Sequence, residues 1–398
     1  MERNVWLYPI YQAARSSTFW LPVFFLYFSS RFDVADVLVL EAIYYGAVVV
    51  LEVPSGYLSD RLGRRPTMVA AAVAWSVGYA ALALGGSWWV FAAGQVAVAM
   101  GMAFNSGTDS TMVYESLAAQ ERGGELAAVE GKAQAWGAIA MAVAALVGGV
   151  LASVDLRFGH ALSAVGTVVA LGVALLFEEP RRAEAAARPM AQLRGVGVAL
   201  RTPALRWVFL FAVAMTVFAH VPYELAQPYL RLVLRDLDFD AFTPAVSGLM
   251  MALMMGAAAL ASRRGEPLAR RIGTANVLLV AMGLEGLVIV GMSLTLHPAV
   301  IGLLLVRSVP GALSRPLELQ CVLPNVGGHL RATYLSVQSL AGRLAFAGTL
   351  ALGSWAVGGL DDLDGAAIST LTGGVAVAVL LALLALALTR RAVRDVGV

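Results

Sequence analysis

The sequence has one cysteine, Cys321, among 398 residues. A single thiol cannot form an intrachain disulfide or a thiolate metal site, so neither is expected. Charge is also scarce, since 14% of the residues are charged, where a soluble domain carries about 25%. The net charge of +2 is too small to indicate a nucleic-acid partner. We find no phosphate-binding loop and no catalytic or metal-ligating cluster, so we expect neither an enzyme nor an ATP-driven pump, and no cofactor or metal.

Apolar residues are abundant and lie in long blocks. They make up 59% of the chain, and the mean hydropathy is +0.77. Blocks of about 20 residues match the hydrocarbon thickness of a bilayer. Lipid cannot satisfy backbone polar groups, and runs this long indicate helices rather than the short alternating strands of a barrel. We therefore predict an all-α polytopic membrane protein with twelve transmembrane helices, near residues 7–30, 37–58, 67–85, 88–114, 133–153, 158–177, 207–231, 243–262, 275–295, 298–321, 333–357 and 366–389.

The distribution of arginine predicts the orientation. Most of the 28 basic residues fall on the side that holds both termini of a chain with twelve spans. Positively charged loops stay in the cytoplasm, so we expect both termini to be cytoplasmic. The N-terminus does not resemble a cleaved signal peptide, because Arg15 lies inside its first apolar block and no small-residue cleavage pattern follows.

The polar stretch Glu178–Arg206 falls in the middle of the chain. It predicts an N-terminal six-helix bundle over residues 1–178, a cytoplasmic linker over 179–206 and a C-terminal six-helix bundle over 207–398. A faint repeat agrees with this division, because Gly-Gly-x-Leu follows the fourth block and again the tenth. Two parallel six-helix halves would produce such a repeat.

One short segment, GYLSDRLGRR from Gly56 to Arg65, lies between the second and third predicted spans. We call it the signature segment. Gly56 would allow a close helix approach, Gly63 a tight turn, and Asp60 could accept hydrogen bonds from a helix N-terminus. Its arginines could pair with acids on neighbouring helices and lock the cytoplasmic side. The predicted gate residues are Gly56, Asp60, Arg61, Gly63, Arg64 and Arg65.

The signature segment resembles the signature loop of the major facilitator superfamily, and the layout of the whole chain is similar to that family. The resemblance implies a secondary transporter that works by alternating access, located as a multi-pass protein in a bacterial inner membrane. The run Glu52-Val53-Pro54-Ser55-Gly56 is similar to a bacterial efflux-type branch. Two features depart from proton antiporters of the family: Gln95 stands where an arginine is common, and span five keeps Gly148-Gly149 without the usual Gly-Pro pair.

Ionisable residues inside predicted spans are expensive and usually functional. The resemblance implies that spans one, four, seven and ten line the central cavity. We predict proton or ion coupling at Glu52, Asp109 and Glu224; the alternative for Asp109 is a structural pair with Arg15. Glu285, on span nine, is interpreted as a structural partner of an arginine, and Arg315 could pair with Glu318 three residues later. The predicted substrate-cavity residues are Arg15, Asn105, Tyr223, Gln227, Arg307, Arg315 and Glu318.

Three functions stay open at this point. Aromatic residues of spans one and two and methionines of span eight favour proton-coupled export of lipophilic or amphiphilic small molecules. The alternative is an importer or facilitator of a small polar metabolite or organic anion, with Arg307 and Arg315 holding a carboxylate. The third is a non-transporting membrane sensor or scaffold. The expected partners are a small-molecule substrate, protons and the lipid bilayer, and the chain is expected to be a monomer.

Overall fold

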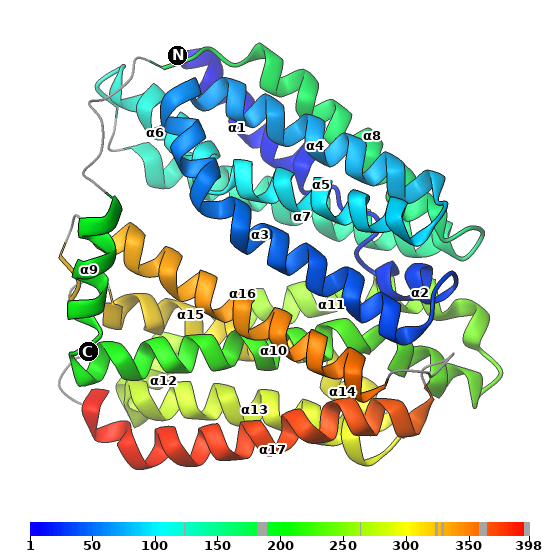
Figure 1. Ribbon diagram of the computed structural model, residues 1–398. Coiled ribbons are helices and arrows are strands. Elements are labelled where there is room, and N and C mark those ends of the chain that lie inside the picture. The colour runs from blue at the N-terminus through cyan, green and yellow to red at the C-terminus, as the bar shows by residue number, and fades with distance from the viewer. Residues whose placement is uncertain are drawn as a thin grey trace. The chain divides into compact units, whose positions relative to one another are not determined.

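The computed structural model describes residues 1–122, 125–180, 189–262, 264–322, 325–327, 330–357 and 364–393. Regular secondary structure in these ranges is entirely helical (Figure 1). The α-helices are α1 Glu2–Arg15, α2 Phe24–Ser29, α3 Val34–Leu62, α4 Arg64–Leu84, α5 Trp88–Asn105, α6 Thr108–Ala118, α7 Leu126–Ala152, α8 Arg157–Leu176, α9 Pro189–Ala199, α10 Pro203–Arg235, α11 Thr243–Ser262, α12 Gly265–Ile272, α13 Thr274–Leu294, α14 Ala299–Leu305, α15 Val309–Val322, α16 Arg331–Ala356 and α17 Gly365–Thr389. Two 3-10 helices, η2 Asp240–Phe242 and η4 Arg390–Val393, complete the set.

Within the described ranges, eleven helical stretches are long and apolar enough to cross a membrane. They correspond to the predicted spans from the second to the twelfth. The chain is therefore a multi-pass membrane protein. Three of the four glycines of the predicted repeat, Gly123, Gly124 and Gly328, lie outside the described residues.

The first predicted span, 7–30, is not one helix. Helix α1 ends at Arg15, and α2 begins only at Phe24. The intervening residues explain the break: the Ser17 hydroxyl bonds the Ala13 carbonyl oxygen at 2.9 Å, so it competes for the backbone, and Pro22 cannot donate a helical hydrogen bond. The single-helix prediction for this block is wrong for that reason.

Two other predicted spans are also interrupted. Span four is α5 followed by α6, with Gly107 in the left-handed region at φ +72° between them. Span ten is α14 followed by α15, with turn residues 306–308 between. Span seven, in contrast, is the single helix α10, which keeps Pro222 and Pro228 inside it. Backbone breaks inside membrane proteins are tolerated where they are buried in protein or line a cavity.

Contacts between Cα atoms divide the chain into two units. Unit 1 comprises residues 1–32, 36–185 and 241–252, and unit 2 comprises 33–35, 186–240 and 253–398. In unit 1, α4 packs against α5 and α8, and α1 packs against α7 and α8.

Glycines of α7 and α8 accommodate the broken segment between α1 and α2. A Cβ on Gly148 would overlap the carbonyl oxygen of Phe19, and one on Gly159 would lie 3.0 Å from the Cα of Trp20. The Trp20 backbone N–H also donates to the Ser163 hydroxyl on α8 at 3.3 Å. Small residues thus let two helices approach an irregular stretch of backbone closely.

We expect Gly148→Ala to destabilise the protein by about 1–3 kcal/mol, because the added methyl group meets a carbonyl oxygen that cannot rotate away. The matched control is Gly172→Ala on α8, where nothing lies within 4 Å of the added carbon. That change should be neutral or slightly stabilising, since alanine favours a helix. Melting of the two purified variants in lipid nanodiscs checks this, and equal melting temperatures would contradict it.

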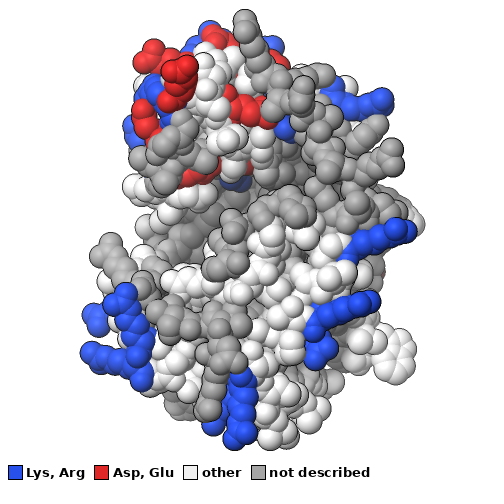
Figure 2. Space-filling model, turned by 90° about the vertical axis from the view of Figure 1, so that its left-hand side faces the viewer, with Lys and Arg blue, Asp and Glu red and all other residues white. Residues whose placement is uncertain are grey.

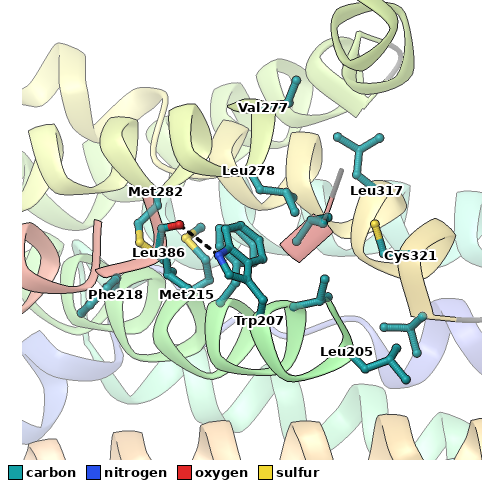
Figure 3. Close-up of a cluster of buried hydrophobic side chains, with 14 of the residues drawn as sticks. Leu205, Trp207, Met215, Phe218, Val277, Leu278, Met282, Leu317, Cys321 and Leu386 are labelled. Carbon is teal, nitrogen blue, oxygen red and sulfur yellow. Dashed lines mark hydrogen bonds between the residues drawn. The ribbon is translucent and has the colours of Figure 1, made fainter. Parts of the chain in front are cut away.

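Unit 2 is built around α10 and α13. Buried residues of α10, α13, α15 and α17 form one apolar cluster, in which Trp207 lies between the two helical layers of Figure 3. The Trp207 indole N–H donates to the Leu386 carbonyl oxygen at 3.0 Å, which satisfies its polar end (Figure 3). The same cluster holds Cys321, which is fully buried. This core holds the interrupted span α14–α15 in place beside α10 and α13.

Candidate functional site

The signature segment is mostly helical rather than a loop, which corrects the sequence interpretation. Helix α3 continues to Leu62, and α4 begins at Arg64. The whole turn is Gly63, whose φ of +112° lies in a region that only glycine adopts without strain. The surroundings of Gly56 and the side chain of Asp60 lie outside the described part of the structure. The tight-turn prediction for Gly63 is confirmed.

Glu179 caps the N-terminus of α4. Its carboxylate accepts hydrogen bonds from the backbone N–H groups of Arg64 and Arg65 at 2.7 and 2.8 Å. These are unsatisfied donors at the N-terminus of α4, where a negative charge is stabilising. A Cβ at Gly63 would collide with the same carboxylate. The sequence analysis missed Glu179, although its place at the start of the linker and its charge were visible.

One arginine of the signature segment, Arg64, pairs with an acid on a neighbouring helix, as predicted. The Arg64 guanidinium forms an ion pair with Glu115 on α6 at 3.2 Å and donates to the Ser59 hydroxyl at 2.8 Å. The Arg65 guanidinium donates to the Leu175 carbonyl oxygen at 2.8 Å. Arg61 is exposed. The segment is therefore tied to α6 and to the end of α8.

The neighbouring Glu178 joins the start of the chain to the same region. Its carboxylate bonds the Met1 ammonium group at 2.6 Å and lies 3.2 Å from Arg3. The hydrogen bond from the ammonium group, and then the two positive charges, hold the pKa of Glu178 below its usual value although partial desolvation opposes them. Figure 2 shows acidic and basic side chains gathered together in the upper part of one face. Mixed charge of this kind favours ion pairs over simple anchoring by positive charge.

We expect Glu179→Ala to loosen the N-terminus of α4. Removing a helix cap costs about 1 kcal/mol, so the amides of Arg64 and Arg65 should exchange hydrogen faster. The matched control is Glu178→Gln, which changes the adjacent carboxylate without touching these amides. Hydrogen exchange read by mass spectrometry measures both variants, and unchanged protection of residues 64–67 in Glu179→Ala would contradict the assignment.

A polar cluster lies inside unit 1, at the break between α5 and α6. One carboxylate oxygen of Asp109 accepts hydrogen bonds from Gln12 at 3.0 Å, Asn105 at 3.0 Å and Arg15 at 3.1 Å. Gly107 allows this arrangement of donors around Asp109. Its left-handed conformation separates α5 from α6, and Asp109 is the second residue of α6. The structure thus brings together three predicted residues, Arg15, Asn105 and Asp109. The side chain of Asp109 is 7% exposed.

Further polar side chains extend this cluster. The Tyr11 hydroxyl donates to Asn105 at 2.7 Å, Gln12 donates to the Tyr8 hydroxyl at 2.9 Å, and Tyr8 donates to Glu130 on α7 at 3.0 Å. The sequence analysis missed Tyr8, Tyr11, Gln12 and Glu130. The spacing of Tyr8, Tyr11, Gln12 and Arg15 along α1 would have placed them on one face. Of the predicted coupling residues, Glu52 is within 3.4 Å of the Ser106 hydroxyl at the same break.

A second cluster lies inside unit 2, at the break between α14 and α15. Arg307 occupies the break, and its guanidinium carbon lies 5.1 Å from the centre of the Tyr223 ring on α10, a cation–π geometry. Glu224 on α10 and Glu285 on α13 both interact electrostatically with Arg307. Their side chains are 1% and 0% exposed. The predicted residues Tyr223, Glu224 and Arg307 are therefore neighbours, and the interpretation of Glu285 as the partner of an arginine agrees with this arrangement.

Hydrogen bonding in this second cluster is incomplete. Among the described residues, the two carboxylate oxygens of Glu285 have no hydrogen-bond partner, and the Nε of Arg307 has none either. Buried polar groups without partners are rare in native proteins and call for an explanation such as a ligand or a functional role. The neighbouring His220 bonds the Thr216 carbonyl oxygen at 2.6 Å and packs on Phe346 at 4.9 Å between ring centres.

The other predicted cavity residues behave differently. Gln227 is buried on α10. Arg315 and Glu318 form the predicted pair on α15 at 3.4 Å, with side-chain exposures of 56% and 6%. Arg315 is therefore largely solvent-accessible in unit 2, whereas Arg307 is buried within its cluster.

The sequence profile of the Major Facilitator Superfamily matches residues 10–350. The chain belongs to the Major Facilitator Superfamily. Its fold is shared with the nucleoside transporter NupG, at a TM-score of 0.78 and 14% identity, with 96% of this chain and 98% of that chain covered. Family membership and these broken, charged spans identify a transporter rather than an enzyme.

Two other solved structures share the fold of this superfamily member. The peptide transporter POT in complex with sulfate matches at a TM-score of 0.75 and 12% identity, covering 99% of this chain and 96% of that one. A bacterial homologue of the human lysosomal transporter Spinster, in an inward-facing and unoccupied conformation, matches at 0.68 and 16% identity, covering 98% and 94%. The sequence has no match among curated proteins.

Proposed function

We propose that this protein is a proton-coupled secondary transporter whose substrate is a small polar solute with an anionic group. The observation that carries the proposal is Arg307 at the break of span ten. It is a buried cation beside the ring of Tyr223, and its Nε has no hydrogen-bond partner among the described residues. Interrupted membrane helices commonly place such groups at the substrate, and a guanidinium is well suited to a carboxylate or phosphate.

Part of the aromatic set that favoured a lipophilic substrate, including Tyr27, is used in packing. Tyr27, Phe28 and Phe91 in unit 1 contact one another in tilted and edge-to-face arrangements, with ring centres 5.2–6.0 Å apart, and each is at most 1% exposed. Met250 and Met254 on α11 are also buried. Side chains enclosed in this way contribute to the core and are not free to line a broad apolar pocket. Export of lipophilic compounds is therefore the second candidate, and the test below includes it.

Proton coupling rests on the buried acids at the two breaks. One oxygen of Asp109 is held by three side-chain donors including Arg15, whereas Glu285 has no hydrogen bond to either oxygen within the described part of the chain. Of the predicted coupling residues, Glu224 shares the Arg307 cluster with Glu285. We propose that protons bind at Glu224 or Glu285 and that Asp109 has a structural role. Moving one charge down a potential of 100 mV supplies about 2.3 kcal/mol, enough to sustain a useful gradient.

Alternating access follows from the family, and we propose its parts for this chain. Two six-helix bundles, over residues 1–178 and 207–398, would rock about a central site, with 179–206 as the linker. The signature segment, tied to Glu115 and Glu179, would hold the side on which it lies shut. We further propose a monomer in a bacterial inner membrane with both termini in the cytoplasm.

The test uses the purified protein in two assays. A thermal-shift screen at two pH values would compare organic anions, nucleosides, peptides and lipophilic cations. Uptake and efflux of any stabilising compound would then be measured in proteoliposomes with and without a proton gradient. We expect stabilisation by a polar anion and transport that the gradient drives. Stabilisation by lipophilic cations alone would favour the second candidate, and transport unchanged by collapse of the gradient would reject proton coupling.

A further inference from the structure

Unit 1 contains a buried acid that the site described above does not use. Glu41 lies on α3 and is 6% exposed, as is Gln95 on α5. The Gln95 side-chain amide donates to the Glu41 carboxylate at 2.7 Å. This is the one hydrogen bond to Glu41 in the described residues, and no ion pair joins it there.

The part of α5 that carries Gln95 packs against apolar residues. Helix α4 packs against α5 and presents Gly78 and Leu82 beside Gly94, the residue before Gln95. One turn earlier, Phe91 is enclosed by the rings of Tyr27, Phe28 and Phe32. On α3 itself the nearest ionisable side chains in sequence are Asp36, Tyr44 and Tyr45.

Two arginines of unit 1, Arg31 and Arg15, contact groups other than Glu41. Arg31 lies over the Tyr27 ring at 5.4 Å and against Gly85, at the end of α4. Arg15, the arginine of the unit's polar cluster, is engaged with Asp109. Glu41 therefore has a neutral amide partner where Asp109 has a cation.

This difference in partners separates the two acids chemically. A buried carboxylate without a cation is expensive, because one amide replaces only part of its hydration. A carboxyl group that keeps its proton can still use the Gln95 amide as donor to its carbonyl oxygen. A carboxylate fixed by an arginine has no such freedom, since losing its charge would strand the cation.

The two acids also lie at different depths. Glu41 is seven residues from the start of α3, about 10 Å along the helix axis. Gln95 is likewise seven residues from the start of α5, whereas Asp109 follows the break at the other end of that span. Glu41 thus sits near the end of unit 1 opposite the signature segment.

We propose that Glu41 is a proton-binding site of this transporter, with Gln95 as the residue that positions its carboxyl group. The site exchanges its proton with water when the end of unit 1 opposite the signature segment is hydrated, and it keeps the proton while that end is closed. In each step one O–H bond forms or breaks, and water is the proton donor or acceptor. A role of Glu41 in transport rests on the proposed proton coupling. The first experiment below detects the proton on Glu41 whether or not transport is coupled to protons.

The first experiment is infrared difference spectroscopy of the full-length protein in nanodiscs between acid and alkaline pH. A protonated carboxylic acid has a C=O stretching band that a carboxylate lacks. We expect one such band to disappear in Glu41→Gln and to shift in Gln95→Leu, which removes the donor and leaves the acid. Asp109→Asn is the control and should leave the band in place. A spectrum that Glu41→Gln does not change would overturn the proposal.

The second experiment measures transport in proteoliposomes once a substrate is known. In Glu41→Gln, uptake driven by a proton gradient should fall to the level of empty liposomes, while substrate exchange without a gradient should continue. Gradient-driven uptake equal to that of the unchanged protein would overturn a role of Glu41 in coupling. The infrared band of Glu41 and the dependence of transport on a proton gradient are separate measurements. If the band is present but transport does not depend on protons, the proposed coupling is rejected and the proton site at Glu41 is retained.

Discussion

Asp109→Asn is expected to destabilise the protein by about 3 kcal/mol, near the lower end of the range for breaking a buried ion pair. The change removes the negative charge opposite Arg15 and leaves that guanidinium in a largely enclosed cluster. The lower end applies because the Arg15 side chain is 24% exposed, so water screens part of its charge.

A double-mutant cycle measures the coupling between the two residues. Arg15→Gln alone should also destabilise, since it leaves the Asp109 carboxylate without its cationic partner and with neutral donors such as Gln12 and Asn105. The double change Arg15→Gln with Asp109→Asn should recover part of the loss, because neither charge is then stranded. Melting in nanodiscs gives all four values. Additive losses would show that the pair contributes no specific coupling.

Arg307→Ala is expected to abolish most anion binding, with a loss of about 2–5 kcal/mol of binding free energy for a truncated charge partner. The guanidinium is buried and lies over the Tyr223 ring. The change should also remove the positive charge that lies near both Glu224 and Glu285. Because this loss could destabilise the protein, its folding has to be measured as well.

The next helix, α15, offers a matched control for Arg307. Arg315 lies on α15 with 56% of its side chain exposed, and it pairs with Glu318 three residues away. Arg315→Ala should leave anion binding within about two-fold, because exposed ion pairs contribute little. Arg307→Lys separates charge from geometry, since lysine keeps the charge without the planar fork. Equal binding loss in Arg307→Ala and Arg315→Ala would contradict the assignment of Arg307 to the substrate.

Several elements were predictable because they depend on local sequence. Apolar blocks of bilayer length gave the spans from the second to the twelfth, since each must bury its backbone polar groups within its own helix. The turn at Gly63 and the pair of Arg315 with Glu318 are also local, set by one glycine and by a three-residue spacing on a helix. Glu41 was equally visible as an acid inside the second predicted span, but the sequence did not show that its partner is neutral.

The interruptions of spans one and ten were not predictable from hydropathy, because a broken helix and a continuous one have the same apolar content. Residues 16–23 are irregular because hydroxyl groups and Pro22 disfavour the helix there, and because Gly148, Gly159 and Gly166 make room for the exposed backbone. Such room is a property of neighbouring helices. The same applies to Glu179, which caps α4 from 115 residues away in the sequence.

The sequence by itself determined that this chain is a membrane transporter of twelve predicted spans with a signature segment, because hydropathy and short spacings are properties of neighbouring residues. Only the tertiary structure decided which buried charges meet. It joined Arg15 to Asp109 across 94 positions and Gln95 to Glu41 across 54, and it set Arg307 beside Tyr223 and Glu285. Electrostatic partners in a low-dielectric interior depend on distances of a few ångströms between helices, which no local pattern encodes.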